Sequence, residues 1–349
     1  MIFVGDIAYP GTIEYNFDDC RYVFDSDDVV ANLEGAITAD ENNYIGKNVA
    51  FNSISVLDYL KQANVKVVSL ANNHITDISR SPSRTKKILE ENNIVACGAG
   101  DTIQEAAAPA EYDTRGTKIY FLAFGWQVIQ CITADSSQPG VNPLDPAHVL
   151  QSIKKLRARE HNSRIIIAMH WGYELELYPL PMHRQLAFAA IDSGADAIIG
   201  CHSHRVQGIE FYKDAPVVYG LGNWFFPHGC FGNGKVSFPD YTRLQLALQW
   251  NMHNGEMVCH WFEYVKDKIF KPVHLASEPV SESQRVKELT PFAGMEHGEY
   301  IRWFSGNRKK KVMLPVYKNY RDTFINGLYD KWMRIRDTII RLLVRLNIK

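Results

Sequence analysis

Short apolar runs rich in valine and isoleucine recur through the first two-thirds of the chain. Seven of them predict strands, over residues 2–6, 29–34, 65–71, 118–125, 164–170, 195–201 and 215–222. Because each run is continuous rather than alternating, we expect these strands to be buried on both faces. Between them, helical spacing of apolar residues and capping signals predict helices over 53–64, 81–93, 145–161 and 182–193. Strands and helices in alternation predict an α/β fold with layered architecture.

The pattern changes after residue 240. Residues 242–250 alternate between polar and apolar side chains, Asn254-Gly255 is a strong hairpin turn signal, and 257–265 is expected to be the return strand. The polar stretch 266–316, with scattered Pro and Gly and four basic residues at 308–311, predicts a loop-rich extension. The sequence therefore predicts a main domain over 1–265, this extension, and a C-terminal helix over 317–349.

The predicted C-terminal helix is amphipathic and basic. Its apolar stripe contains Tyr317, Tyr320, Phe324, Leu328, Trp332, Ile335, Ile339, Leu342 and Leu346. The opposite face carries six Lys or Arg residues against Asp330 and Asp337. Three arrangements would cover the stripe: packing against the domain, pairing with a second copy as a short coiled coil, or lying on an anionic membrane surface.

Charge and composition exclude some classes of function. The formal net charge is −1 and the pI is near 6.9, so we expect no nucleic-acid partner. The six cysteines are scattered without a CxxC pair, and we expect them to be reduced and mostly buried. The N-terminus shows no secretory signal, and no run of about 18 apolar residues occurs. These features predict a cytoplasmic protein.

Residues that can bind metal stand at the ends of six of the seven predicted strands. They are Asp6, Glu34, Asn73 with His74, His170, His202 with His204, and Asn223. Ligands of open α/β sheets bind outside the carboxyl ends of the strands, so we expect these side chains to converge. Carboxylates, amides and imidazoles without thiolates suit a divalent transition metal such as Mn, Fe or Zn.

Several of these residues also have a structural explanation. Asp6 could cap the following segment, Asn73 and His74 could form a turn, and His170 could be a core histidine. His202 and His204 lie two residues apart at a strand end, where neither a helix face nor capping accounts for them.

Six motifs occur together in one order along residues 1–227. They are Gly5-Asp6, Asn32-Leu33-Glu34, Ala71-Asn72-Asn73-His74, His170-Trp171-Gly172 with Glu174, Gly200-x-His202-x-His204 with Gln207, and Leu221-Gly222-Asn223. This order resembles the CapA family of poly-γ-glutamate capsule biosynthesis proteins, whose domain is similar to the calcineurin-like metallophosphoesterases. The resemblance implies a four-layer α-β-β-α sandwich.

The resemblance also implies a role for each site residue. Asp6 and His204 would bind a first metal, and Glu34 would take the place of the bridging carboxylate. A second metal would be bound by Asn73, His170 and His202, and His74 would be the acid that protonates the leaving group. The metallophosphoesterases begin with Asp-x-His, whereas this chain has Asp6-Ile7-Ala8. We therefore expect one tight metal site and at most one weak site.

The function implied by the resemblance is that of a metal-dependent hydrolase in the synthesis of a bacterial capsule or extracellular polymer. A metal-activated water would attack a phosphoester or amide bond. The alternative is a non-catalytic accessory factor that binds the polymer or the capsule synthase complex and has a degenerate metal site. A third hypothesis is a scaffold at the inner face of the membrane that works through the C-terminal helix.

Overall fold

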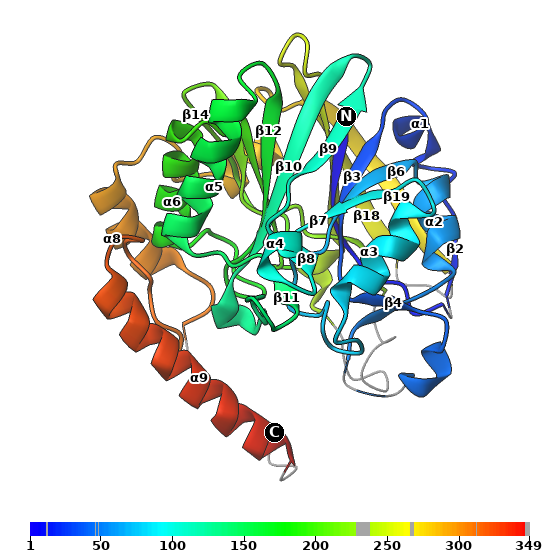
Figure 1. Ribbon diagram of the computed structural model, residues 1–349. Coiled ribbons are helices and arrows are strands. Elements are labelled where there is room, and N and C mark those ends of the chain that lie inside the picture. The colour runs from blue at the N-terminus through cyan, green and yellow to red at the C-terminus, as the bar shows by residue number, and fades with distance from the viewer. Residues whose placement is uncertain are drawn as a thin grey trace.

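Two β-sheets pack face to face, with helices on the outer face of each (Figure 1). The computed structural model describes residues 1–11, 13–45, 47, 49–227, 238–265, 269–311 and 313–345, and for residues 341 and 343–345 the backbone alone. Within these residues the strands of the first sheet follow the order β2 (Glu14–Tyr15), β19 (Ile269–Pro279), β18 (Met257–Val265), β17 (Leu244–Trp250), β1 (Ile2–Ile7), β3 (Val29–Leu33), β6 (Val65–Ser69) and β7 (Val95–Cys97), and β16 (Asn223–Phe225) also pairs with β1. The strands of the second sheet follow the order β14 (Ile209–Tyr212), β15 (Ala215–Val218), β13 (Ala197–Cys201), β12 (Arg164–His170), β10 (Thr117–Gly125) and β9 (Ala110–Thr114).

The core lies between the sheets, and the layers give the predicted α-β-β-α sandwich. Phe3 and Val67 of the first sheet face Phe121 and Ile166 of the second. On the outside of the first sheet, α2 (Val56–Gln62) contacts β6 and α3 (Pro82–Glu90) contacts β7. On the outside of the second sheet, α6 (Pro181–Asp192) contacts β13, and α5 (Pro146–Arg159) packs beside α6.

All seven predicted strands, the four predicted helices and the hairpin of β17 and β18 are confirmed, with ends that differ by a few residues. The sequence pattern missed the shorter elements. Beyond those already given, they are α1 (Arg21–Phe24), β4 (Ala36–Thr38), η1 (Glu41–Asn43), β5 (Phe51–Ser53), β8 (Ala99–Gly100), α4 (Ile103–Ala106), η2 (Gln127–Ile129), β11 (Gly140–Val141) and η4 (Asp240–Arg243). Elements of two to five residues are too short to show a period. The described cysteines, all except Cys230, are free and buried, as expected.

The prediction of a loop-rich extension over 266–316 is wrong for the described residues. β19 pairs with β18 along its length and extends the first sheet. It is followed by α7 (Gln284–Leu289) and α8 (His297–Asn307), which buries Tyr300 and Phe304 and packs against α6. The sequence of this segment is polar because β19 lies near the edge of the sheet and one of its sides is largely exposed to solvent. Few of its side chains therefore need to be apolar.

The predicted C-terminal helix is present as α9 (Thr323–Arg345), but its apolar stripe faces solvent. Tyr317 and Tyr320 precede the helix and are buried against the domain. The stripe residues on the helix are exposed: Phe324, Leu328, Trp332, Ile335, Ile339 and Leu342. Packing of the stripe against the domain is therefore wrong for the described residues, and Leu346 lies outside them. Within the described chain, no helix is both long and apolar enough to cross a membrane.

The carboxyl ends of the parallel strands in both sheets lie at one edge of the sandwich. β1 is central, since its first half pairs with β17 and its second half pairs with β16, where Asp6 is opposite Asn223. Gly5 makes this arrangement possible, because a Cβ at this position would lie 1.8 Å from the carbonyl oxygen of Gly222. β1, β3 and β6 run parallel in one sheet, as do β10, β12 and β13 in the other. Residues that follow these strands therefore meet between the two sheets.

Candidate metal centre

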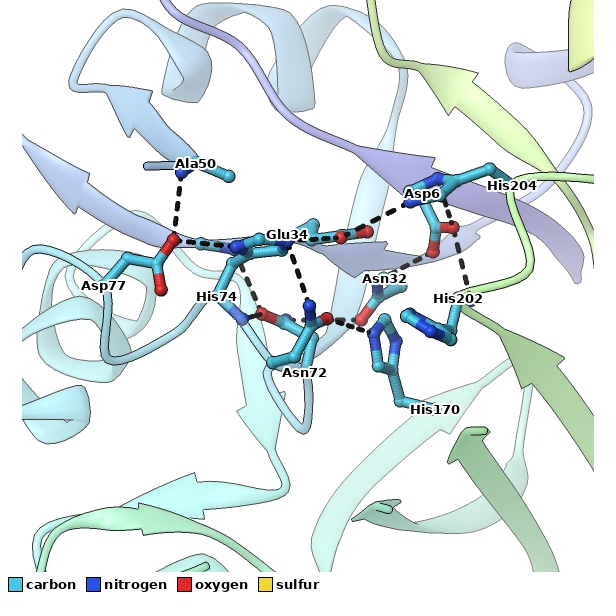
Figure 2. Close-up of polar contacts among 12 residues, drawn as sticks. Asp6, Asn32, Glu34, Ala50, Asn72, His74, Asp77, His170, His202 and His204 are labelled. Atoms are coloured by element: carbon cyan, nitrogen blue, oxygen red, sulfur yellow. Dashed lines mark hydrogen bonds and ion pairs between the residues drawn. The ribbon is translucent and has the colours of Figure 1, made fainter. Parts of the chain in front are cut away.

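Asp6 is the centre of the site and is held by hydrogen bonds from Asn32 and His202 (Figure 2). The residue is completely buried in the second half of β1. The side-chain amide of Asn32 donates to its Oδ1 at 2.8 Å, and the backbone N–H of His202 donates to its Oδ2 at 3.3 Å. Burial raises the pKa of Asp6, and the nearby His204 opposes this shift. The two hydrogen bonds orient the carboxylate and leave it facing the other polar groups of the site.

Glu34 is a buried carboxylate without a hydrogen-bond partner among the described residues. It follows β3, and neither carboxylate oxygen accepts a hydrogen bond. The nearest cationic candidates are Nε2 of His74 at 3.6 Å and Nε2 of His204 at 3.9 Å from its Oε1. Burial raises the pKa of Glu34 well above its usual value, and the charge of Asp6 adds to this. A buried carboxylate without a hydrogen bond is unfavourable unless a proton or a cation neutralises it.

His204 completes a group of three residues that fits one metal ion. Its Nδ1 lies 2.7 Å from Oδ1 of Asn223 and 3.5 Å from Oδ2 of Asp6. The candidate ligand atoms of Asp6, Glu34 and His204 all lie within 4.8 Å of one another, and all three residues are buried. Two carboxylates and an imidazole form a donor set of the kind that Mn, Fe and Zn accept. The residues therefore fit a divalent transition metal.

The loop after β13 holds its two histidines in an unusual backbone conformation. His202 has φ 91° and His204 has φ 54°, which is the left-handed region. A residue other than glycine adopts this region at a cost of about 1–3 kcal/mol, and such strain is concentrated at functional sites. The conformation brings both rings into the site, with their centroids 6.0 Å apart.

His170, His202 and Asn73 form a second group beside the first. Nε2 of His170 lies 2.8 Å from Oδ1 of Asn73, and the rings of His170 and His202 are 4.8 Å apart. Nδ1 of each histidine is buried without a hydrogen-bond partner in the described part of the chain. Burial lowers the pKa of both imidazoles well below the usual value, so both are neutral and each has a nitrogen lone pair to offer.

His74 lies at the open side of the site and is oriented by Asp77. Nδ1 of His74 lies 2.7 Å from Oδ2 of Asp77, which also accepts the backbone N–H of Ala50 at 3.0 Å. The carboxylate of Asp77 favours the tautomer of His74 that carries a proton on Nδ1, and Nε2 is then directed at the site. There it lies 3.0 Å from the amide nitrogen of Asn73. The side chain of His74 is 30% exposed, whereas that of Glu34 is 0% exposed, so a substrate can reach His74 from solvent.

The structure brings together all eight residues that the sequence analysis selected, Asn223 included. Their individual roles as ligands or as an acid stay predictions. Asp77 and Asn32 received no role from the sequence, although Asn32 belongs to one of the motifs and the spacing His74-x-x-Asp77 was a signal that an acid could reach the imidazole. Ala8, at the position where the metallophosphoesterases have a histidine, is buried in a small apolar cluster with Phe51 and Phe226.

Fold and site together define an α/β sandwich protein with a buried carboxylate–imidazole centre at its strand ends. The family model described as "Bacterial capsule synthesis protein PGA_cap" matches residues 2–228, so the chain belongs to this family and the resemblance to CapA is confirmed.

Two curated relatives are named for the same process. The chain is 30% identical to the capsule biosynthesis protein CapA of Bacillus anthracis over 215 residues, which are 60% of this chain and 52% of that protein. It is 32% identical to the PGA biosynthesis protein CapA of Bacillus subtilis (strain 168) over 209 residues, which are 58% of this chain and 54% of that protein. The chain thus spans about half the length of these curated relatives. Among solved structures, a 5'-nucleotidase precursor from Thermus thermophilus is similar with a TM-score of 0.43 and 11% identity, over 80% of this chain and 53% of that one.

Proposed function

We propose that this chain is a metal-dependent hydrolase that acts in the synthesis of a bacterial capsule or another extracellular polymer. The observation that carries the proposal is Glu34, whose two carboxylate oxygens are buried without a hydrogen bond from any described residue. A carboxylate that served only to stabilise the fold would be paired with donors. A metal ion held by Glu34, Asp6 and His204 would supply the missing partner.

The first group of residues would hold one divalent transition metal tightly. Asp6, Glu34 and His204 would be its ligands, and Mn, Fe and Zn are the candidates. When bound, such a metal supplies Lewis-acid polarisation of an oxygen. Asn73, His170 and His202 would form a weaker second site, because they include no carboxylate and two of them already share a hydrogen bond.

His74 and Asp77 would move the proton. A substrate that enters from the open side meets Nε2 of His74 first, since this side chain is partly exposed. Protonated His74 would donate from Nε2 to the leaving group of a phosphoester or an amide. Asp77 holds the ring through Nδ1 and stabilises its charged form.

A second candidate function is a non-catalytic accessory factor that binds the polymer. The apolar surroundings of Ala8 favour it, because they leave no polar side chain where a further metal ligand would stand. One relative, from Mycobacterium tuberculosis (strain ATCC 25618 / H37Rv), is named a probable polyglutamine synthesis accessory protein. In this case the site would bind a metal for structure, and the chain would hydrolyse nothing.

Metal titration separates these possibilities. We expect metal-free protein to take up one equivalent of Mn or Zn tightly and at most one more weakly, as measured by calorimetry and elemental analysis. His202→Ala should remove the weak site and leave the tight one, and substitution of the exposed His253 is the matched control. Hydrolysis of chromogenic phosphoesters and amides by the loaded protein would then favour the enzyme over the accessory factor. Failure to retain any metal after reconstitution would contradict both the site and the hydrolase.

A further inference from the structure

A cleft of about 440 Å³ opens beside the metal centre, and one of its walls comes from outside the family domain. Asn73, Glu174 and His202 line the side that belongs to residues 2–228. The opposite wall comes from the segment after α8 and from the inner face of α9. It contains Lys309, Lys310, Lys311, Leu314, Met333, Arg336 and Asp337. The cleft therefore reaches Asn73 and His202 of the second group, and the C-terminal part of the chain completes it on the other side.

The three lysines are held at the cleft by their backbone. Glu176, which is buried, accepts the backbone N–H of Lys309 at 3.0 Å and that of Lys310 at 2.7 Å. The buried side chain of Arg308 donates to the carbonyl oxygens of Lys310 and Leu314 and closes the loop. These contacts order the loop without using the ammonium groups.

The ammonium groups of the lysines stay available for a ligand. Within the described chain none of them pairs with a carboxylate; that of Lys309 lies 5.9 Å from the ring centre of Tyr178, and that of Lys311 lies 3.4 Å from the carbonyl oxygen of Gly306. Arg336 is paired with Asp337 at 3.2 Å. The cleft is thus cationic at its outer wall, next to the buried carboxylates of the metal centre.

We propose that Lys309, Lys310 and Lys311 bind an oxyanion group of the substrate and hold it in the cleft beside the metal centre. The proposal rests on the proposed function for its reference to a substrate. The group bound would be a carboxylate or a phosphate, because the compact ammonium charge of lysine donates hydrogen bonds to the oxygens of either. The lysines would thereby favour anionic substrates.

The test is binding of two probes, inorganic phosphate and γ-glutamylglutamate, to the metal-free full-length chain. We expect the triple variant Lys309→Gln/Lys310→Gln/Lys311→Gln to lose affinity for at least one probe by about tenfold or more, the usual worth of a charged hydrogen bond. The control variant Lys61→Gln/Lys86→Gln/Lys87→Gln removes the same number of positive charges from α2 and α3, away from the cleft. It should bind both probes like the wild type. If the triple variant loses affinity for phosphate alone, the bound oxyanion is a phosphate, and if it loses affinity for the dipeptide alone, the oxyanion is a carboxylate.

Unchanged affinity of the cleft variant for both probes would overturn the proposal, as would equal losses in the control. Because these measurements are made without metal, they do not depend on the metal site. Metal content of the same variants, measured separately, should match the wild type. A further outcome is that the wild type binds no metal while the triple lysine variant still loses affinity for an oxyanion. This result would contradict the proposed function and support the oxyanion site in the cleft.

A different observation concerns the outer face of α9. The helix lies at the lower edge of the molecule and extends away from the two sheets (Figure 1). Its inner face contacts the domain through Met333, which is 4% exposed, and through Asp330, which accepts the hydroxyl of Tyr317 at 2.8 Å. Its outer face carries the six exposed stripe residues, from Phe324 at 76% exposed to Leu342 at 56%.

The charges around this stripe are of one sign. Lys331 and Arg334 are exposed beside it, whereas the helix's two acidic residues are used elsewhere, Asp330 toward Tyr317 and Asp337 toward Arg336. An apolar helix face flanked by cations fits the boundary between headgroups and acyl chains of an anionic bilayer. We infer that the stripe docks on an anionic membrane surface, with the cleft wall formed by the opposite face.

Vesicle co-sedimentation of the full-length chain tests this inference. We expect binding to phosphatidylglycerol-containing vesicles at low salt, weaker binding at high salt, and little binding to phosphatidylcholine alone. Leu328→Gln/Ile335→Gln/Ile339→Gln should weaken binding by about tenfold or more, because each change removes a side chain from the apolar contact. The matched control replaces exposed apolar residues elsewhere: Ile132, Ile269 and Leu275.

Two results would overturn the membrane inference. One is the absence of vesicle binding by the wild type at low salt. The other is a wild-type dimer in solution that the stripe variant converts to a monomer, since the stripe would then be covered by a second copy.

Discussion

Glu34→Gln is expected to lose the tightly bound metal. The substitution keeps the size of the side chain and removes the charge that no hydrogen bond from the described residues satisfies. Outer-shell partners of a metal are already worth about 10–100-fold in affinity, so loss of a direct carboxylate ligand should cost more than about 100-fold. Elemental analysis after dialysis, followed by titration of metal-free protein, measures the effect.

A second readout of Glu34→Gln separates a ligand from a structural residue. Without metal, the variant should unfold at a higher temperature than the wild type, because a buried carboxylate without a hydrogen bond destabilises the fold. Glu174→Gln, at the exposed rim of the cleft, changes the same chemical group and should retain the metal. Metal content of Glu34→Gln equal to that of the wild type would show that Glu34 is not a ligand.

His74→Asn is expected to lower turnover without releasing metal. General acid–base catalysis by a positioned side chain is worth about 10²–10⁴-fold, and the loss should fall in this range. The site supports this separation, since His74 is partly exposed and is held by Asp77, whereas the three residues that fit the metal are buried. Turnover of a chromogenic substrate and metal content are measured on the same preparation.

Asp77→Asn is the companion variant for His74. It keeps a group near Nδ1 but removes the charge that orients the ring, so it should lower turnover in the same direction and leave the metal in place. If His74→Asn loses metal and activity together, His74 is a ligand or a structural residue, and the assignment of the acid is wrong.

The sequence predicts which residues of the metal centre converge, but not which of their atoms are in contact. The strand ends were predictable because long runs such as 164–170 show their burial in the sequence itself, and parallel strands end at the same edge of a sheet. The convergence of Asp6 and His204 was therefore predictable, although most of the family domain separates them along the chain, and the family resemblance implied that they share one metal. Which atoms meet was beyond the sequence, because the 3.5 Å between Asp6 Oδ2 and His204 Nδ1 depends on the left-handed backbone at His204.

The sequence by itself determined the α/β class, the positions of the main strands along the chain and the residue types at their ends. These follow from local periodicity and from motifs of a few residues. Only the tertiary structure decided that Glu34 has no hydrogen-bond partner among the described residues and that Asp77 reaches His74. It also decided that α9 turns Met333 and Asp330 to the domain, while its apolar stripe and the neighbouring Lys331 and Arg334 face solvent. The periodicity of a helix shows that two faces differ, but which face is buried depends on the surface it meets, and here that surface offers the hydroxyl of Tyr317 to Asp330.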